Sequence, residues 1–232
     1  MQASKMDMLQ RLAAGFGPLV NKIVFMGSAT LDLYVTDQAA PSNRPTEEID
    51  CLATMPIGEF WDSLPQLEAA GFERTPQEDS PFPKWNLQGI KVNLFPLQTE
   101  ALGYYNKWYE EGLFHAQPYT LSDGQEIRIF HPVYYLAAKV EAFIQRGNMD
   151  FRNSVDFEDI MFMMDYRQEL VKDIQAAFHE VRGYIRDHFR TFLKHPDLEE
   201  GIYWHMPFSA GEGAVEKIFQ TMRQIAEYEM AS

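Results

Sequence analysis

Apolar residues run without interruption from Ile23 to Met26 and stop at Gly27-Ser28. A short apolar run that ends in a glycine turn is typical of a buried strand. Further along the chain, Glu48-Ile49-Asp50 alternates polar and apolar side chains. Alternate side chains of a strand share one face, so we expect Glu48 and Asp50 to project together while Ile49 turns into the core.

A second alternating stretch covers residues 89–96 and follows the hairpin-like sequence KWNLQG. Apolar residues at helical spacing predict helices in the N-terminal segment, over 58–71, over 132–147, from about 154, within 170–192 and over 212–228. Strands and helices therefore alternate up to about residue 130, and the chain is helical from Pro132 onward. The pattern predicts an α+β protein, with an α/β domain over 1–130 and a helical domain over 131–232.

The two predicted strand segments carry candidate chemistry. A carboxylate pair on one strand face suits Mg²⁺, which prefers oxygen ligands. The Gly27-Ser28 turn opens a predicted helix, whose backbone N–H groups and dipole favour a phosphate group. Together these features indicate a metal-dependent phosphoryl-transfer site, with Glu48 and Asp50 holding the ion.

The order Gly27-Ser28, then Arg44-Pro45-Thr46, then Glu48-Ile49-Asp50 resembles the nucleotidyltransferase superfamily, and most of all its AbiEii-type, abortive-infection toxin-like branch. The resemblance covers roughly residues 20–170. It implies a nucleotidyltransferase-fold mixed sheet followed by a helical C-terminal domain. It also implies Mg²⁺-dependent transfer of a nucleoside monophosphate from an NTP to an acceptor hydroxyl. The acceptor is unknown, and an antitoxin-like protein is a further expected partner.

Two positions depart from the family pattern. Glu48 stands where the family usually carries Asp, and Asn93 stands where it carries the third metal ligand and base. Asn offers a carbonyl oxygen to a metal but is neutral and takes no proton at neutral pH. The resemblance therefore implies a metal site of Glu48, Asp50 and Asn93 with impaired transfer. The alternatives are a non-catalytic NTP-binding protein and a toxin-like interaction protein of the same fold.

The resemblance assigns further residues to the site. Lys139, on the helix predicted from Pro132, would contact nucleotide phosphates, and Asp156, on the next helix, would lie in the same cleft as Glu48. The expected catalytic set is Glu48, Asp50, Asn93, Lys139 and Asp156. The expected nucleotide-binding set is Gly27, Ser28, Arg44, Thr46, Lys139 and Arg146.

Each feature also has an ordinary alternative. Gly27-Ser28 is compatible with a plain strand-to-helix turn, and the Glu48/Asp50 pair with a solvated strand face. Lys139 alone would be read as a surface lysine, and Asp156 as a charge that complements a helix N-terminus. Because all of these occur in the family order, we favour the shared site. The aromatic residues Tyr104, Tyr105, Trp108 and Tyr109 are expected in the core, with a base-stacking wall as the alternative.

Composition sets the outer limits. The 232 residues, 46% hydrophobic and 23% charged, are enough for a full core. The 20 basic and 34 acidic residues give a formal charge of −14, which argues against strong non-specific binding to nucleic acid, though a local basic patch is compatible with it. The single cysteine, Cys51, excludes an internal disulfide and is expected in the core. With no long apolar run and no secretory signal pattern, we expect a cytoplasmic protein without a membrane span.

Overall fold

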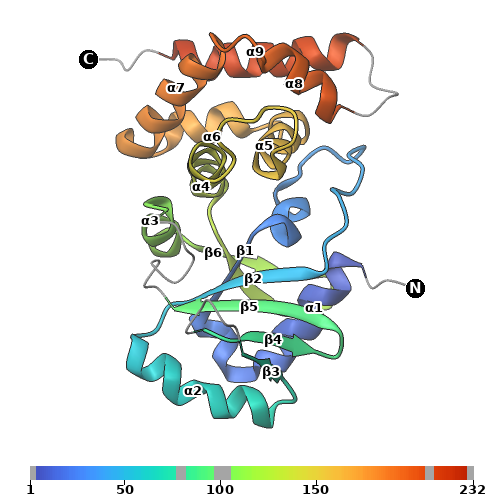
Figure 1. Cartoon of the computed structure of the whole chain (residues 1–232), viewed down its shortest axis with the longest axis vertical. Coiled ribbons are helices and arrows are strands. Elements are labelled where there is room, and N and C mark those ends of the chain that lie inside the picture. Colours follow the sequence, from blue (N-terminus) through green and yellow to red (C-terminus); the bar gives the residue numbers. More distant parts are fainter. Residues whose placement is uncertain (1–3, 77–81, 97–105, 207–211, 229–232) are drawn as a thin grey trace. The chain divides into compact units, whose positions relative to one another are not determined.

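The computed structural model describes residues 4–76, 82–96, 106–206 and 212–228 (Figure 1). The helices of the described residues are α1 (Lys5–Phe16), η1 (Gly17–Lys22, a 3₁₀ helix), η2 (Ser28–Tyr34, also 3₁₀), α2 (Ile57–Ala69), α3 (Trp108–Phe114), α4 (Pro132–Gln145), α5 (Val155–Tyr166), α6 (Leu170–Ala176), α7 (His179–Phe192), α8 (Leu198–His205) and α9 (Glu212–Glu227). The strands are β1 (Ile23–Met26), β2 (Glu48–Ala53), β3 (Glu73–Thr75), β4 (Lys84–Leu87), β5 (Ile90–Pro96), β6 (Gln117–Thr120) and β7 (Glu126–Ile129).

The chain divides into two compact units. The first unit comprises residues 1–32 and 43–131, and the second comprises residues 33–42 and 132–232. The structure changes unit at residues 131–132, and it groups residues 33–42 with the second unit. This segment packs with the helical unit, because Thr36 and Asp37 donate backbone hydrogen bonds to the carbonyl oxygen of Tyr166.

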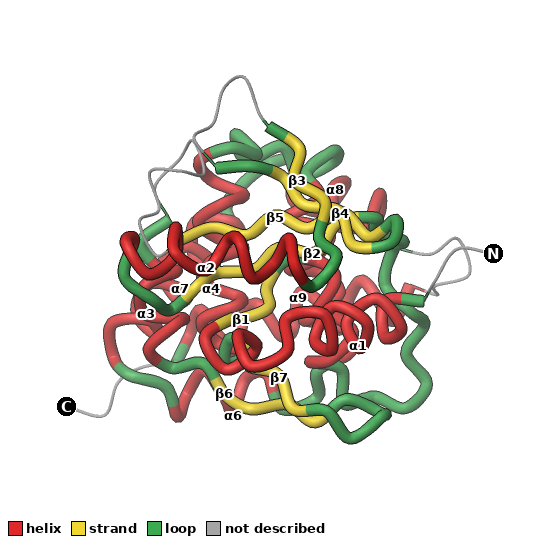
Figure 2. The backbone as a smooth tube through the Cα atoms, turned by 90° about the horizontal axis from the view of Figure 1, so that it is seen from below, coloured by secondary structure: helices red, strands yellow, loops and turns green. Residues whose placement is uncertain are grey.

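The first unit is built on a mixed sheet, as the sequence predicts. The described strands form one seven-stranded sheet in the order β3-β4-β5-β2-β1-β7-β6. Strand β2 is central and pairs parallel with β5 and antiparallel with β1. Helices α1 and α2 run across one face of this sheet (Figure 2). The α+β class is therefore confirmed in this coarse form.

Apolar patterning explains most of the elements. All four residues of β1 are buried, whereas β2 alternates at its start: Ile49 and Cys51 are fully buried, and Glu48 and Asp50 are half-buried. The predicted core position of Cys51 is thus confirmed, and its burial raises the pKa of the thiol well above the ordinary value. The buried side chains on the opposite face fix which way the carboxylates of β2 point.

The second unit is helical and centres on an aromatic cluster. The ring of Phe143 in α4 contacts three other rings. Its centroid lies 4.9 Å from that of Phe151, which precedes α5, 5.1 Å from that of Phe157 in α5 and 5.4 Å from that of Phe192 in α7. Edge-to-face and tilted pairs at such distances add to the apolar area that the rings bury. The predicted helices over 132–147 and 212–228 are confirmed as α4 and α9. The stretch 170–192 is two helices, α6 and α7, because the chain extends at Ala177 and Phe178.

Two further expectations concern the first unit. Trp108 and Tyr109 are buried, as core packing requires. Tyr104 and Tyr105 lie outside the described residues.

Of the described residues, no helix has the length and apolar character that a membrane crossing needs.

Candidate functional site

Strand pairing brings the two carboxylates of β2 beside Asn93 of β5. The parallel register places Asp50 directly next to Asn93, and Glu48 next to Lys91. The side-chain amide of Asn93 donates hydrogen bonds from Nδ2 to Asp50 Oδ1 at 2.8 Å and to Glu48 Oε2 at 3.3 Å. One amide nitrogen therefore joins both carboxylates, and the three predicted metal-site residues form one cluster.

Gly27 lies directly against this cluster. It ends β1 with a φ of +76°, a backbone conformation that side-chain-bearing residues rarely adopt. A Cβ atom at this position would lie 2.5 Å from Asp50 Oδ2, which is far inside van der Waals contact. The glycine is therefore needed both for the turn and for the space that the Asp50 carboxylate occupies.

The segment after Gly27 forms a 3₁₀ helix, η2, where the sequence predicts a helix. Ser28 Oγ accepts a hydrogen bond from Arg44 Nη2 at 2.6 Å, which brings the predicted residues Ser28 and Arg44 together. Thr46 contacts the backbone at the start of β2, and its expected nucleotide contact stays a prediction. Its hydroxyl accepts from the Glu48 N–H at 3.2 Å and donates to the Glu48 carbonyl oxygen at 3.1 Å, so that it fixes the backbone at the start of β2.

The chemistry of the donors decides whether a divalent cation fits. Glu48 and Asp50 are hard oxygen ligands of the kind that Mg²⁺ accepts, and both are half-buried and within reach of one amide. Asn93 presents its N–H₂ group to them, so only its carbonyl oxygen is left as a neutral ligand. In the described part of the chain, no group of three or more His, Cys, Asp or Glu side chains is placed to hold a metal. Two charged oxygen ligands are therefore available to a divalent cation, and the Asn93 side chain as placed turns its N–H₂ group toward them.

Lys84 is a member of this cluster that the sequence reasoning did not assign to the site. Its Nζ lies 3.5 Å from Glu48 Oε1, and it pairs with Asn93 in the antiparallel register of β4 and β5. The turn between these strands is Gln88-Gly89, with φ values of 51° and 89°. A two-residue turn of this kind fixes the hairpin register, so KWNLQGIKVN already contained the signal that places Lys84 opposite Asn93.

The other predicted residues belong to the helical unit. Lys139 of α4 is buried, and its Nζ lies 3.0 Å from Asp156 Oδ1 and 2.7 Å from Asp159 Oδ2. Arg146 makes two hydrogen bonds of 2.7 Å to the same Asp156 carboxylate. Asp159 was not assigned from the sequence, although its spacing of three residues from Asp156 places both on one helix face.

Mutual pairing sets the ionisation of this network. Burial lowers the pKa of the Lys139 ammonium, but Asp159 and Asp156 outweigh burial and hold this pKa above its ordinary value. Burial likewise raises the pKa of Asp156, but Lys139 and Arg146 outweigh it and hold this pKa below its ordinary value. The charges therefore compensate one another within the helical unit. Contact of Lys139 with phosphate, and a cleft that it shares with Glu48, stay predictions.

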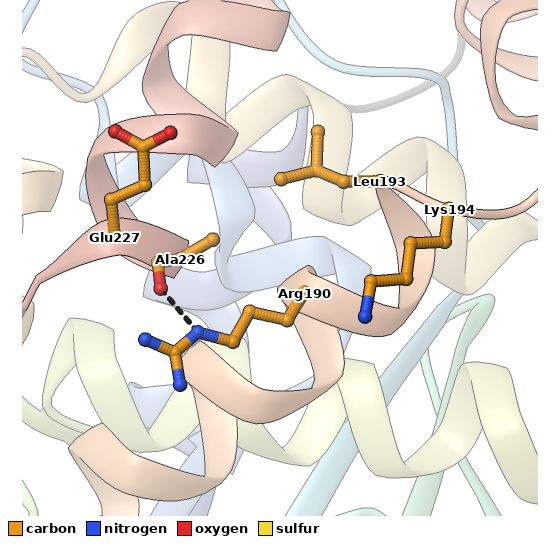
Figure 3. Close-up of a pocket in the computed structure, with 5 residues that line it drawn as sticks. All are labelled: Arg190, Leu193, Lys194, Ala226 and Glu227. Atoms are coloured by element: carbon orange, nitrogen blue, oxygen red, sulfur yellow. Dashed lines mark hydrogen bonds between the residues drawn. The ribbon is translucent and has the colours of Figure 1, made fainter.

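A separate cavity of about 350 Å³ lies in the helical unit. It is lined by Arg190, Leu193, Lys194, Ala226 and Glu227, and Arg190 Nε donates to the Ala226 carbonyl oxygen at 2.6 Å (Figure 3). None of the predicted site residues lines this cavity. It therefore adds nothing to the carboxylate cluster of the sheet.

Comparison with known proteins gives no assignment: no protein-family model matches this chain, and no curated protein sequence matches it. The site is therefore interpreted from its own residues.

Proposed function

We propose that the first unit binds an NTP with Mg²⁺ and acts as a nucleotidyltransferase whose transfer step is slow. The observation that carries the proposal is the cluster at the end of β1. There Glu48 and Asp50 share the Asn93 amide, and Gly27 leaves room for the Asp50 carboxylate. Two carboxylates beside a glycine turn match what the sequence resemblance implies for the ion and the triphosphate.

In this proposal Glu48 and Asp50 hold the ion, and Asn93 would serve as a neutral third ligand after its side-chain amide turns its carbonyl oxygen toward the ion. When bound, Mg²⁺ would offset negative charge on the transferring phosphoryl group. At the turn after β1, Arg44 donates a hydrogen bond to the Ser28 hydroxyl, so two of the predicted nucleotide-binding residues lie together there.

Slow transfer follows from Asn93. Nucleotidyl transfer joins an acceptor oxygen to the α-phosphorus and releases pyrophosphate, and it is helped by a group that takes the hydroxyl proton. A general base typically contributes about 10²–10⁴-fold to such a step, and an amide cannot act as one. For the same reason, non-catalytic NTP binding is the second candidate function. Control by an antitoxin-like partner stays a prediction.

The proposal is tested by calorimetric titration with ATP, GTP, CTP and UTP, each with and without Mg²⁺. We expect Mg²⁺-dependent binding of at least one nucleotide, because the carboxylate pair supplies the ion's charged ligands. Glu48→Gln and Asp50→Asn keep the size of each side chain and remove its charge, so both should abolish the dependence on Mg²⁺.

The matched control is Glu47→Gln. Glu47 is the neighbouring carboxylate, but it pairs with Lys91 at 2.7 Å. Its substitution should leave Mg²⁺-dependent binding intact. Absence of binding with all four nucleotides, with and without Mg²⁺, would refute the proposed function.

A further inference from the structure

A row of side chains crosses three strands at the candidate site. The sheet register places Lys84 of β4 opposite Asn93 of β5, and Asn93 beside Asp50 of β2. Directly paired residues of neighbouring strands project from the same face of a sheet. The row therefore carries a positive, a neutral and a negative side chain in that order.

Lys84 also reaches the second carboxylate of the cluster. Its ammonium lies 3.5 Å from Glu48 Oε1, while the Asn93 amide donates to Glu48 Oε2 at 3.3 Å. Each oxygen of Glu48 thus has a positive or hydrogen-bond-donating partner, one from β4 and one from β5. A divalent cation at Glu48 and Asp50 would lie close to this ammonium and be repelled by it.

From this geometry we propose that Lys84 is a built-in counter-ion that lowers the affinity of the Glu48/Asp50 site for divalent cations. The proposal rests on the proposed function, because it concerns the same pair of carboxylates. It goes further by assigning a residue that tunes the site. The lysine side chain partly neutralises the carboxylates when no metal is bound, and a metal has to compete with it.

The size of the effect is limited by solvent. The Lys84 side chain is 46% exposed and the Glu48 side chain 43% exposed, so the pair is substantially screened. Removing the positive charge should therefore tighten divalent-cation binding by roughly three- to tenfold at low salt. The gain should shrink as salt is added, because screening weakens the repulsion.

The experiment measures the affinity of the full chain for Mn²⁺ alone, by electron paramagnetic resonance of free Mn²⁺ at low and high salt. Lys84→Gln should bind Mn²⁺ more tightly than the unsubstituted protein, and Lys84→Arg, which keeps the charge, should bind like it. The matched control is Lys22→Gln. Lys22 forms an ion pair with Glu59, and the two side chains are 49% and 45% exposed, much like Lys84 and Glu48. Lys22 directly precedes the first residue of β1, whereas the candidate site lies at the last residue.

The outcomes separate the two proposals. Equal Mn²⁺ affinity of Lys84→Gln and the unsubstituted protein, with binding that Asp50→Asn removes, overturns the counter-ion role and leaves the metal site standing. An equal gain from Lys22→Gln overturns it as well, because the effect would then follow overall charge. If neither the unsubstituted protein nor Lys84→Gln binds Mn²⁺, this inference is overturned, while the proposed function is decided separately by the nucleotide titrations.

Discussion

At the scale of single residues, Gly27 shows how one missing side chain shapes the site. Two separate observations require glycine here. The φ of Gly27 is +76°, and an added Cβ atom would lie only 2.5 Å from Asp50 Oδ2. The second is local to the functional group, because the atom that would have to move is the tip of the Asp50 carboxylate. A substitution here should therefore change metal binding as well as stability.

Gly27→Ala is expected to destabilise the protein by about 1–3 kcal/mol through its backbone strain and to displace the Asp50 carboxylate. Gly71→Ala is the matched control, because Gly71 has a φ of +92° but has no atom within 4 Å of an added Cβ. Denaturant unfolding should show a loss in both variants. Titration with Mn²⁺ should show weaker binding in Gly27→Ala alone, and equal affinities in the two variants would contradict the steric role of Gly27.

Asn93 is the second position where one residue sets the chemistry. An Asp here would replace an amide that donates to both carboxylates with a third negative charge. Asn93→Asp should therefore lower the melting temperature in the presence of EDTA, because like charges would crowd the cluster. The same variant should recover more stability on addition of Mg²⁺ than the unsubstituted protein does.

Asn93→Asp should also raise transfer from a labelled NTP, since it restores both a charged ligand and a proton acceptor, by up to about 10²–10⁴-fold. The two proteins are compared side by side with the same acceptor. A fast unsubstituted protein that is slowed by the substitution would show that Asn93 does not stand in for a carboxylate.

At the scale of elements, helices α4 and α5 are joined by a buried ionic network. Lys139 is 8% exposed, Asp156 2% and Asp159 0%, so these charges are largely removed from water. Such groups are tolerated when each has its partners, and losing one partner leaves an uncompensated buried charge. The network therefore makes the packing of α4 on α5 sensitive to single substitutions.

Lys139→Met is expected to destabilise the helical unit by about 3–5 kcal/mol, because Asp156 and Asp159 lose their shared counter-charge. Arg152→Met is the control: Arg152 pairs with Glu200, both side chains are exposed (48% and 58%), and its loss should cost less than about 1 kcal/mol. Denaturant unfolding followed by circular dichroism measures both. Equal losses in the two variants would be evidence against a special role of the buried network.

The network also gives stability a dependence on pH. The pKa of Asp156 is lowered in the folded protein, so its contribution is complete above its unfolded pKa of about 4 and is lost as the pH falls through the folded value. The pKa of Lys139 is raised, so its contribution is complete below about pH 10 and is lost as the pH rises through the folded value. The free energy of unfolding of the unsubstituted protein should fall beyond both limits, and Lys139→Met should flatten the alkaline loss.

At the scale of the whole molecule, the two compact units carry the predicted residues separately. Gly27, Ser28, Arg44, Thr46, Glu48, Asp50 and Asn93 belong to the first unit, and Lys139, Arg146 and Asp156 to the second. Each set is internally connected by the contacts described above. With a formal charge of −14, we expect the molecule not to bind nucleic acid strongly and non-specifically.

The sequence by itself determined the local features. Alternation of polar and apolar residues set Glu48 and Asp50 on one face of a strand, and helical spacing indicated α2, α4 and α9. These follow from backbone periods of two and 3.6 residues, which can be read from neighbours in the chain. The hairpin register of Lys84 and Asn93 was also present locally, in the two-residue turn.

Only the tertiary structure decided which distant residues meet. The parallel pairing of β2 with β5 places Asn93 beside Asp50 and within hydrogen-bond reach of Glu48, and no periodic pattern within either strand specifies that register. Tertiary packing likewise decides which carboxylates pair with Lys139, and it places residues 33–42 with the helical unit. The physical reason is that such contacts are chosen by burial of whole surfaces and by compensation of buried charge, which depend on elements far apart in the chain.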